Sequence, residues 1–218
     1  MRIVDLTRPI KSLNTPMFPG YPQPLRTVLT TIEEHGYRSH VWTLVEHTST
    51  HVDAPAHFVS GGTTIDEMPL ETFVGWGTAI DMSFKEPESL ITRRELEERI
   101  EELRRRGIDV GEGWVLIIHT GYGDKAGTPE WFRHPGLSED ACRYLLELGI
   151  KAVGVDAPSP DRDPFPAHRL LLPRGVAIYE NLANTDKIVG TKFLFVGAPL
   201  KLERGTASPV RALAIYLE

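Results

Sequence analysis

Short runs of apolar residues, each closed by polar positions, recur along this chain and predict strands. Two early segments, 27–32 and 37–46, are rich in Val, Thr, Trp and Leu. That composition suits a pleated, half-buried surface, and we predict strands there. Later runs are nearly continuous, which is typical of strands buried in the centre of a sheet. They lie at residues 114–119, 152–156, 192–196 and 210–217.

Two other segments repeat their apolar positions at helical spacing. Thr92 and Glu95 have the spacing of a capping box, and the apolar face that follows continues until Gly107. A second helix is predicted from Ser138 to Gly149. The alternating Glu and Arg residues of the first helix indicate a solvated face with ion pairs one turn apart.

The order of these elements indicates the fold class. Early strands followed by strand–helix alternation predict a mixed α/β (α+β) fold, with a central mixed β-sheet and helices packed on it. Between residues 9 and 24 the chain holds five prolines, which predict an irregular loop. The length of 218 residues and the uniform composition predict one domain over residues 1–218.

Charge, cysteine content and hydropathy narrow the class of protein. The 30 acidic residues exceed the 24 basic ones, with no basic stripe, so we expect no nucleic-acid partner. Cys142 is the only cysteine, which excludes an intrachain disulfide and a four-cysteine zinc site. No run approaches the ~20 apolar residues of a membrane span. Near the N-terminus, Asp5 and Pro9 come before an apolar stretch as long as that of a signal peptide can form. We therefore expect a cytoplasmic protein without a membrane partner.

A cluster of histidines carries the candidate chemistry. His47, His51, Asp53 and His57 lie within eleven residues and all at odd positions. In an extended strand His47 and His51 would be roughly 13 Å apart, so the chain must bend for them to share a ligand. We expect a strand ending near His47 and a tight loop carrying the rest. Imidazole and carboxylate suit Zn²⁺ or Mn²⁺, and three protein ligands leave a position open for water.

The segment 47–57 resembles the signature of the metal-dependent hydrolases of the cyclase family, with Ser49 in place of a glycine. The likeness extends to residues 18–20, 155–159 and 208–212, and to His168 with an acid twelve residues later. The resemblance implies a swivelling β/β/α cyclase-like domain. It also implies a homodimer or homotetramer.

The resemblance implies a metal centre built by His47, His51, Asp53, His168 and Glu180. The first three would hold one ion, which Glu180 completes. Asp53 and Glu180 would bridge to a second ion held by His168, so the chain would hold one or two Zn²⁺ or Mn²⁺ ions. By sequence pattern alone, His168 lies in a short helix at 167–172 and Glu180 at a strand end, and neither is identified as a ligand.

The resemblance also implies roles in catalysis. His57 would be the proton shuttle, and Phe18 stands where kynurenine formamidases carry a tryptophan that packs on the aromatic substrate. The implied reaction is hydrolysis of a small-molecule amide, of arylformamidase type: N-formylkynurenine to kynurenine and formate. Alternatives are an isatin-hydrolase-like opening of a cyclic amide or lactone, a degenerate binding member of the family, and a protein with a purely structural metal. We interpret His119 as a strand-end cap, and His35, His40 and His134 as ordinary surface or core residues.

Overall fold

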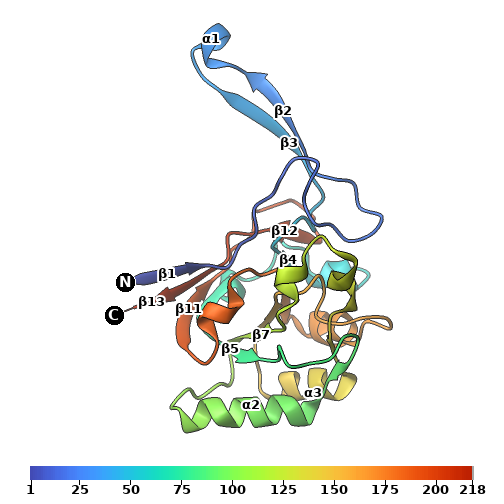
Figure 1. Ribbon diagram of the computed structural model, residues 1–218, viewed down its shortest axis with the longest axis vertical. Helices are drawn as coiled ribbons and strands as arrows, with labels where there is room; N and C mark the ends of the chain where they lie inside the picture. Colours follow the sequence, from blue (N-terminus) through green and yellow to red (C-terminus); the bar gives the residue numbers. More distant parts are fainter. Residues whose placement is uncertain (218) are drawn as a thin grey trace.

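The structure, a computed structural model that describes residues 1–217, is organised around one nine-stranded mixed sheet (Figure 1). The strands lie in the order β1-β13-β11-β5-β7-β9-β10-β4-β12. Their bounds are β1 (Arg2–Asp5), β4 (His51–Asp53), β5 (Val74–Asp81), β7 (Val115–His119), β9 (Ala152–Val155), β10 (Ala177–Glu180), β11 (Lys192–Val196), β12 (Ala207–Pro209) and β13 (Leu213–Tyr216). The predicted mixed α/β class is confirmed.

The centre of this sheet is parallel and its flanks are antiparallel. β5, β7, β9 and β10 run parallel to one another. On one side β11 pairs antiparallel with β5, and β13 and β1 continue antiparallel; on the other side β4 pairs antiparallel with β10, and β12 with β4. As predicted, the runs at 114–119 and 152–156 form the buried central strands β7 and β9. The run at 192–196 forms β11, but β11 and β13 lie nearer the edge and are only half buried. The last run enters its strand only at Leu213.

Both faces of the sheet carry a hydrophobic core. In β7, Leu116 and Ile118 join one core, while Val115 and Ile117 join the other. The first core lies under the helices α2 (Arg93–Arg105) and α3 (Glu139–Glu147), seen together at the bottom of Figure 1. The second combines side chains of the sheet, from β4, β10, β11 and β13 among others, with side chains of loops and 3₁₀ helices such as Ile65, Phe73 and Ile188.

The two predicted helices begin where the sequence indicates. The Thr92 hydroxyl accepts from the Glu95 amide, and the Glu95 carboxylate accepts in return from the Thr92 amide at 2.8 Å. Ser138 caps α3. The predicted segment 167–172 forms α4 (Pro166–Leu171). The shorter elements are β6 (Leu90–Ile91), β8 (Gly136–Leu137) and the 3₁₀ helices η1 (Pro55–His57), η2 (Leu70–Phe73), η3 (Tyr122–Lys125), η4 (Pro129–Arg133), η5 (Leu172–Arg174) and η6 (Thr185–Ile188).

The first two predicted strands form a hairpin that projects from the body of the molecule (Figure 1). β2 (Leu25–Thr30) pairs antiparallel with β3 (Ser39–Thr43), and α1 (Ile32–His35) lies at its tip. The strands are confirmed, but their expected half-burial is wrong, because most of their side chains are exposed. Leu29, for example, is 63% exposed, because the hairpin projects away from the rest of the described structure.

The proline-rich segment before the hairpin is irregular, as predicted: residues 6–24 contain no helix or strand. Among residues 1–217, no helix combines the length and the apolar character needed to cross a membrane. That residues 1–218 form a single domain stays a prediction.

Candidate metal centre

Strand β4 positions the centre of the histidine cluster. His51 and Asp53 are two residues apart in this strand, so their side chains point to the same side of the sheet, while Val52 faces the second core. β4 pairs antiparallel with β10, and the register places Glu180 directly opposite His51. This pairing explains how an acid so distant in sequence joins the cluster.

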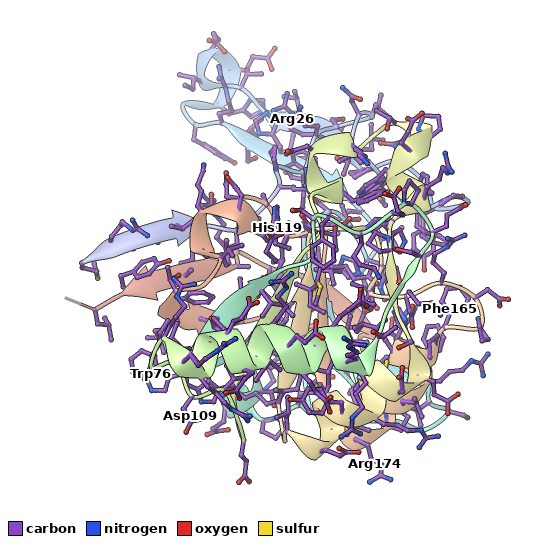
Figure 2. All side chains as sticks on the ribbon, turned by 60° about the horizontal axis from the view of Figure 1, so that its bottom comes forward. Arg26, Trp76, Asp109, His119, Phe165 and Arg174 are labelled. Carbon is purple, nitrogen blue, oxygen red and sulfur yellow. The ribbon has the colours of Figure 1, made fainter. Side chains whose placement is uncertain are left out.

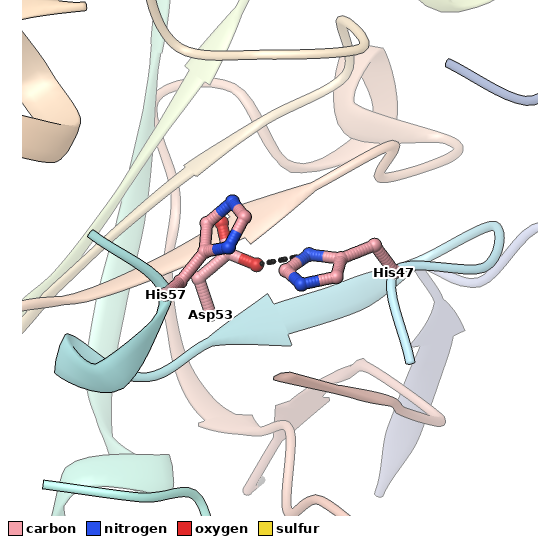
Figure 3. A group of neighbouring side chains, drawn as sticks. All are labelled: His47, Asp53 and His57. Atoms are coloured by element: carbon pink, nitrogen blue, oxygen red, sulfur yellow. Dashed lines mark ion pairs between the residues drawn. The ribbon is translucent and has the colours of Figure 1, made fainter. Parts of the chain in front are cut away.

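The bend required between His47 and His51 is present, but the predicted strand and loop positions are wrong. β3 ends already at Thr43, and His51–Asp53 is itself a strand rather than part of a loop. A turn and a bend at residues 46–50 bring the His47 Nδ1 atom to 2.9 Å from Asp53 Oδ1 (Figure 3). The chain can bend there before β4 because neighbouring strands on both sides of β4 fix only residues 51–53.

Ser49 occupies the turn in a left-handed conformation, with φ of 58°. This is the position where the related signature has glycine, which adopts such angles at lower cost. The Ser49 hydroxyl donates to the Arg8 carbonyl at 3.1 Å, and the Ser49 carbonyl accepts from His51 Nδ1 and Asn181 Nδ2 at 2.9 and 3.0 Å. These hydrogen bonds hold the strained turn and orient the His51 ring.

The remaining predicted residues reach the same point from other elements. His168 projects from α4, and its Nε2 atom lies 3.6 Å from Asp53 Oδ2 and 3.4 Å from Glu180 Oε1. His51 Nε2 lies 3.3 Å from Asp53 Oδ1 and 3.4 Å from Glu180 Oε2. His57 ends the short helix η1, next to His47 and Asp53 (Figure 3). All six polar residues selected from the sequence therefore converge.

Among residues 1–217, two sets of three side chains have the separations of a shared metal ligand sphere. Within each set the ligand atoms lie within 4.8 Å of one another: one set is His51, Asp53 and Glu180, and the other is His47, Asp53 and His57. His57 is therefore placed both as a candidate ligand and as a candidate proton shuttle, and its predicted role stays a prediction.

Unpartnered buried atoms show that these residues fit a cation. His51 Nε2 and both carboxylate oxygens of Asp53 are buried and form no hydrogen bond. These atoms lie close to their neighbours, with His47 Nδ1 2.9 Å and His51 Nε2 3.3 Å from Asp53 Oδ1, yet none of the contacts has the geometry of a hydrogen bond. Buried polar groups without partners are costly, and a divalent ion satisfies this donor set.

Electrostatics of the site follow from burial and from its acids. Burial lowers the pKa of His51, but the charges of Asp53 and Glu180 outweigh it and raise that pKa to about 9. Burial raises the pKa of Glu180, and the charge of Asp53 adds to the effect. Burial lowers the pKa of His57 to about 4, against the charge of Asp53. His51 must therefore lose a proton before an ion binds, and metal affinity decreases as the pH is lowered.

Three of the four clustered imidazoles are held by a hydrogen bond at the nitrogen that faces away from the cluster. His47 Nε2 contacts the Thr206 hydroxyl at 3.1 Å, His51 Nδ1 donates to the Ser49 carbonyl, and His168 Nδ1 lies 2.9 Å from an Asp161 oxygen. Such contacts orient metal-binding histidines. By contrast, neither ring nitrogen of His57 has a hydrogen-bond partner within residues 1–217.

A pocket of about 220 Å³ opens above the cluster. Phe18 lies on its wall, as expected for a substrate contact, and is 46% exposed. Four further aromatic residues of the wall were not predicted from the sequence as site residues. They are Tyr21, Phe58, Trp131 and Phe165. Proximity to Phe18 and His57 in sequence was the only available signal, and it applies to Tyr21 and Phe58 alone.

His119 lies outside this cluster, at the end of β7. Its Nδ1 atom lies 2.8 Å from the Thr185 hydroxyl and 3.2 Å from Asp156 Oδ2. Figure 2 shows His119 well separated from Phe165, which lines the pocket. This position agrees with the interpretation of His119 as a strand-end residue. His35, His40 and His134 are likewise absent from both candidate ligand sets within residues 1–217.

The fold and the donor set together define a metal-dependent hydrolase. Residues 4–162 match the family described as "Putative cyclase". The chain therefore belongs to the cyclase family, as the sequence signature indicates.

Individual relatives agree with this assignment. A kynurenine formamidase of Bacillus cereus is 30% identical over 215 residues, covering 96% of this chain and 95% of that protein. The crystal structure of an isatin hydrolase bound to the product analogue thioisatinate superposes with a TM-score of 0.88 at 27% identity, covering 99% and 92% of the two chains. A structure described as a potential metal-dependent hydrolase with cyclase activity has a TM-score of 0.80 at 31% identity, with 98% and 96% coverage.

Proposed function

We propose that this protein hydrolyses an aryl formamide, with N-formylkynurenine as the substrate and kynurenine and formate as the products. One observation carries the proposal: buried, unpartnered atoms of His51 and Asp53 lie close together at an aromatic-lined pocket. Kinship with a kynurenine formamidase over nearly the whole chain supports the amide as the substrate class.

The residues that would hold the metal are His47, His51, Asp53, His168 and Glu180. When bound, a divalent ion such as Zn²⁺ or Mn²⁺ supplies a nucleophile at neutral pH and polarises a carbonyl oxygen. The two oxygens of Asp53 lie near different histidines: Oδ1 is near His47 and Oδ2 is near His168. This arrangement supports one or two ions per chain, with Asp53 between the two positions.

The other residues bind the substrate and move the proton. Phe18 and the aromatic wall would stack on a planar ring and hold its amide over the cluster. His57 would take a proton at a free ring nitrogen and deliver it to the departing nitrogen of the amide. This role needs an imidazole that no neighbour holds in place, and His57 is the one clustered histidine with that property among the described residues.

A second candidate is the opening of a cyclic amide, favoured by the superposition on an isatin hydrolase. Both reactions use the same donor set, so the pocket alone distinguishes their substrates. A purely structural metal is disfavoured because the cluster lies open to a pocket rather than closed off by the protein.

The decisive experiment measures metal content per chain by elemental analysis, together with hydrolysis of N-formylkynurenine and isatin before and after chelation. We expect bound metal and formamide turnover that chelation removes and added metal restores. If metal-loaded protein hydrolyses only isatin, the proposed substrate is wrong but the proposed class of reaction, metal-dependent hydrolysis, stands. Protein that remains metal-free and inactive after reconstitution would contradict the metal centre.

We also propose that the protein is a homodimer or homotetramer that uses the projecting hairpin. An isolated two-stranded sheet is marginally stable in water. Both of its faces carry exposed apolar side chains, among them Val28 at 58% and Val41 at 47%. A second copy of the chain that covers these side chains would stabilise the hairpin, and closed symmetric assemblies are the commonest oligomers.

A further inference from the structure

A buried carboxylate next to α4 has been named so far only as one of the contacts of His168. Asp161 is 1% exposed and precedes the helix by a few residues. Its Oδ2 atom accepts from the backbone amides of Ala167 at 2.6 Å and His168 at 3.1 Å. Its Oδ1 atom accepts from the Ser159 hydroxyl at 3.1 Å and lies 2.9 Å from His168 Nδ1. Both oxygens are therefore fully used.

These contacts decide which nitrogen of His168 is available to a ligand. A carboxylate can only accept hydrogen bonds, so it places a proton on Nδ1. The opposite nitrogen, Nε2, then faces Asp53 Oδ2 and Glu180 Oε1. Because Asp161 also caps the first amides of α4, the same side chain fixes both the ring and the backbone that carries it.

The partners of the other clustered histidines are uncharged. His47 contacts a threonine hydroxyl and His51 a backbone carbonyl. A hydroxyl can donate or accept and therefore does not fix the proton of its partner. Within residues 1–217, His168, which lies outside the 47–57 segment, is the one clustered histidine whose outward-facing nitrogen contacts a buried acid.

We propose that Asp161 is a positioning residue that prepares His168 for a second metal ion and thereby sets how tightly that ion binds. The inference rests on the proposed metal-dependent function and deepens it. Asp161 is neither a residue of the pocket wall nor a member of either candidate ligand set, although two of its partners, Ser159 and His168, line the pocket. Of these two partners, His168 is the one that reaches the ligand atoms, so Asp161 acts on the metal centre through His168.

Asp161→Asn in the full-length protein tests this. The amide has one acceptor oxygen, so it cannot serve both the imidazole and the backbone amides of α4. Metal-stripped protein is titrated with Zn²⁺ against a chromophoric chelator, and the bound ions are counted by elemental analysis. We expect the first ion to bind as in the wild type and the second to bind about 10- to 100-fold more weakly.

A double-mutant cycle separates positioning from general damage to the fold. In a His168→Ala background, Asp161→Asn should change neither ion's affinity by more than about twofold, because the partner through which it acts is gone. Ser159→Ala is the matched control: it removes one donor to Asp161 but keeps the carboxylate, and the second ion should bind as in the wild type. If Asp161→Asn does not fold, Asp161→Glu, which keeps the charge but displaces it, replaces it with the same expectation.

The outcomes distinguish this inference from the proposed function. Equal affinity for the second ion in the wild type and in Asp161→Asn would overturn it, as would an equal loss in the His168→Ala background. Wild-type protein that binds one ion only would also overturn it, while leaving a mononuclear hydrolase intact. Wild-type protein that binds no ion would contradict the proposed function itself.

Discussion

At the scale of single residues, His57 differs from the other clustered histidines by its freedom. A ligand needs a fixed ring, whereas a proton shuttle needs a ring nitrogen that can exchange its partner. His47, His51 and His168 have fixed rings, and within residues 1–217 His57 has none of their hydrogen bonds. The distinction rests on contacts and not on position, because all four rings lie close together.

His57→Ala should therefore separate chemistry from metal binding. We expect turnover to fall about 10²- to 10⁴-fold, the usual contribution of a positioned acid–base group. Metal content, measured by elemental analysis on the same sample, should remain that of the wild type. A parallel His51→Ala variant should lose metal and activity together. Joint loss in His57→Ala would instead show that His57 is a ligand.

The sequence carried much of this residue-level information. The odd spacing from His47 to His57 indicates a shared direction, and β4 confirms it for His51 and Asp53. The bend at Ser49 follows from the need to bring His47 close, but the serine itself gives no sign of a positive φ, since its hydrogen bonds to Arg8 and Asn181 come from distant segments. Those contacts exist only in the folded chain.

At the scale of elements, the ends of β7 and β9 are tied together by His119 and Asp156. The ion pair with Asp156 raises the pKa of His119, against partial burial. Burial raises the pKa of Asp156, but hydrogen bonds from His119 and Thr120 outweigh it and lower that pKa. The charged pair is thus present from acidic pH up to the raised pKa of His119.

The pair predicts a pH-dependent contribution to stability. A histidine whose pKa is raised on folding stabilises the protein fully below its unfolded pKa of about 6.5, and this contribution disappears as the pH rises through the folded pKa. His119→Gln should therefore lower the free energy of unfolding by about 1 kcal/mol at pH 5.5, and by less at pH 9. Urea denaturation at both pH values measures it. A loss that is equal at both, or larger at pH 9, would contradict the prediction.

The positions of strands and helices were predicted more reliably than the pairing between strands. Apolar runs and caps located β7, β9, β11, α2 and α3, because burial and capping leave local patterns. Pairing leaves no such pattern: nothing in the sequence near Glu180 shows that it lies opposite His51, and only the resemblance to a family identified it. The predicted burial of the hairpin was wrong for the same reason, since its Val, Thr and Trp residues indicate strands without indicating what covers them.

At the scale of the whole molecule, the hairpin is the largest departure from a compact body (Figure 1). Its exposed apolar side chains lie on both faces, so one copy of the chain leaves them in water. Its base continues directly into the segment that carries His47, on one side, and into the loop that carries Phe18 and Tyr21, on the other. Assembly through the hairpin would therefore also restrain the walls of the pocket.

Replacing Val28, Leu29 and Val41 together by Thr tests the assembly. Threonine keeps the strand propensity and removes apolar surface, so the hairpin should form but no longer associate. Light scattering coupled to gel filtration should show an oligomer for the wild type and a smaller species for the variant. Leu70→Thr, at a position 73% exposed on the body, is the control and should leave the mass unchanged. A monomeric wild type, or a variant with the wild-type mass, would contradict the proposal.

The antiparallel register of β4 and β10 has a further consequence for how the chain folds. About 130 residues separate His51 from Glu180, so an ion held by both would close a long loop, much as a covalent cross-link does. Synthesis from the N-terminus produces the 47–57 segment early, yet the ligand sphere is complete only once β10 has been made and has docked. The ion would thus bind late in folding and stabilise a strand arrangement that has already formed. Its release would destabilise strands from both halves of the chain at once.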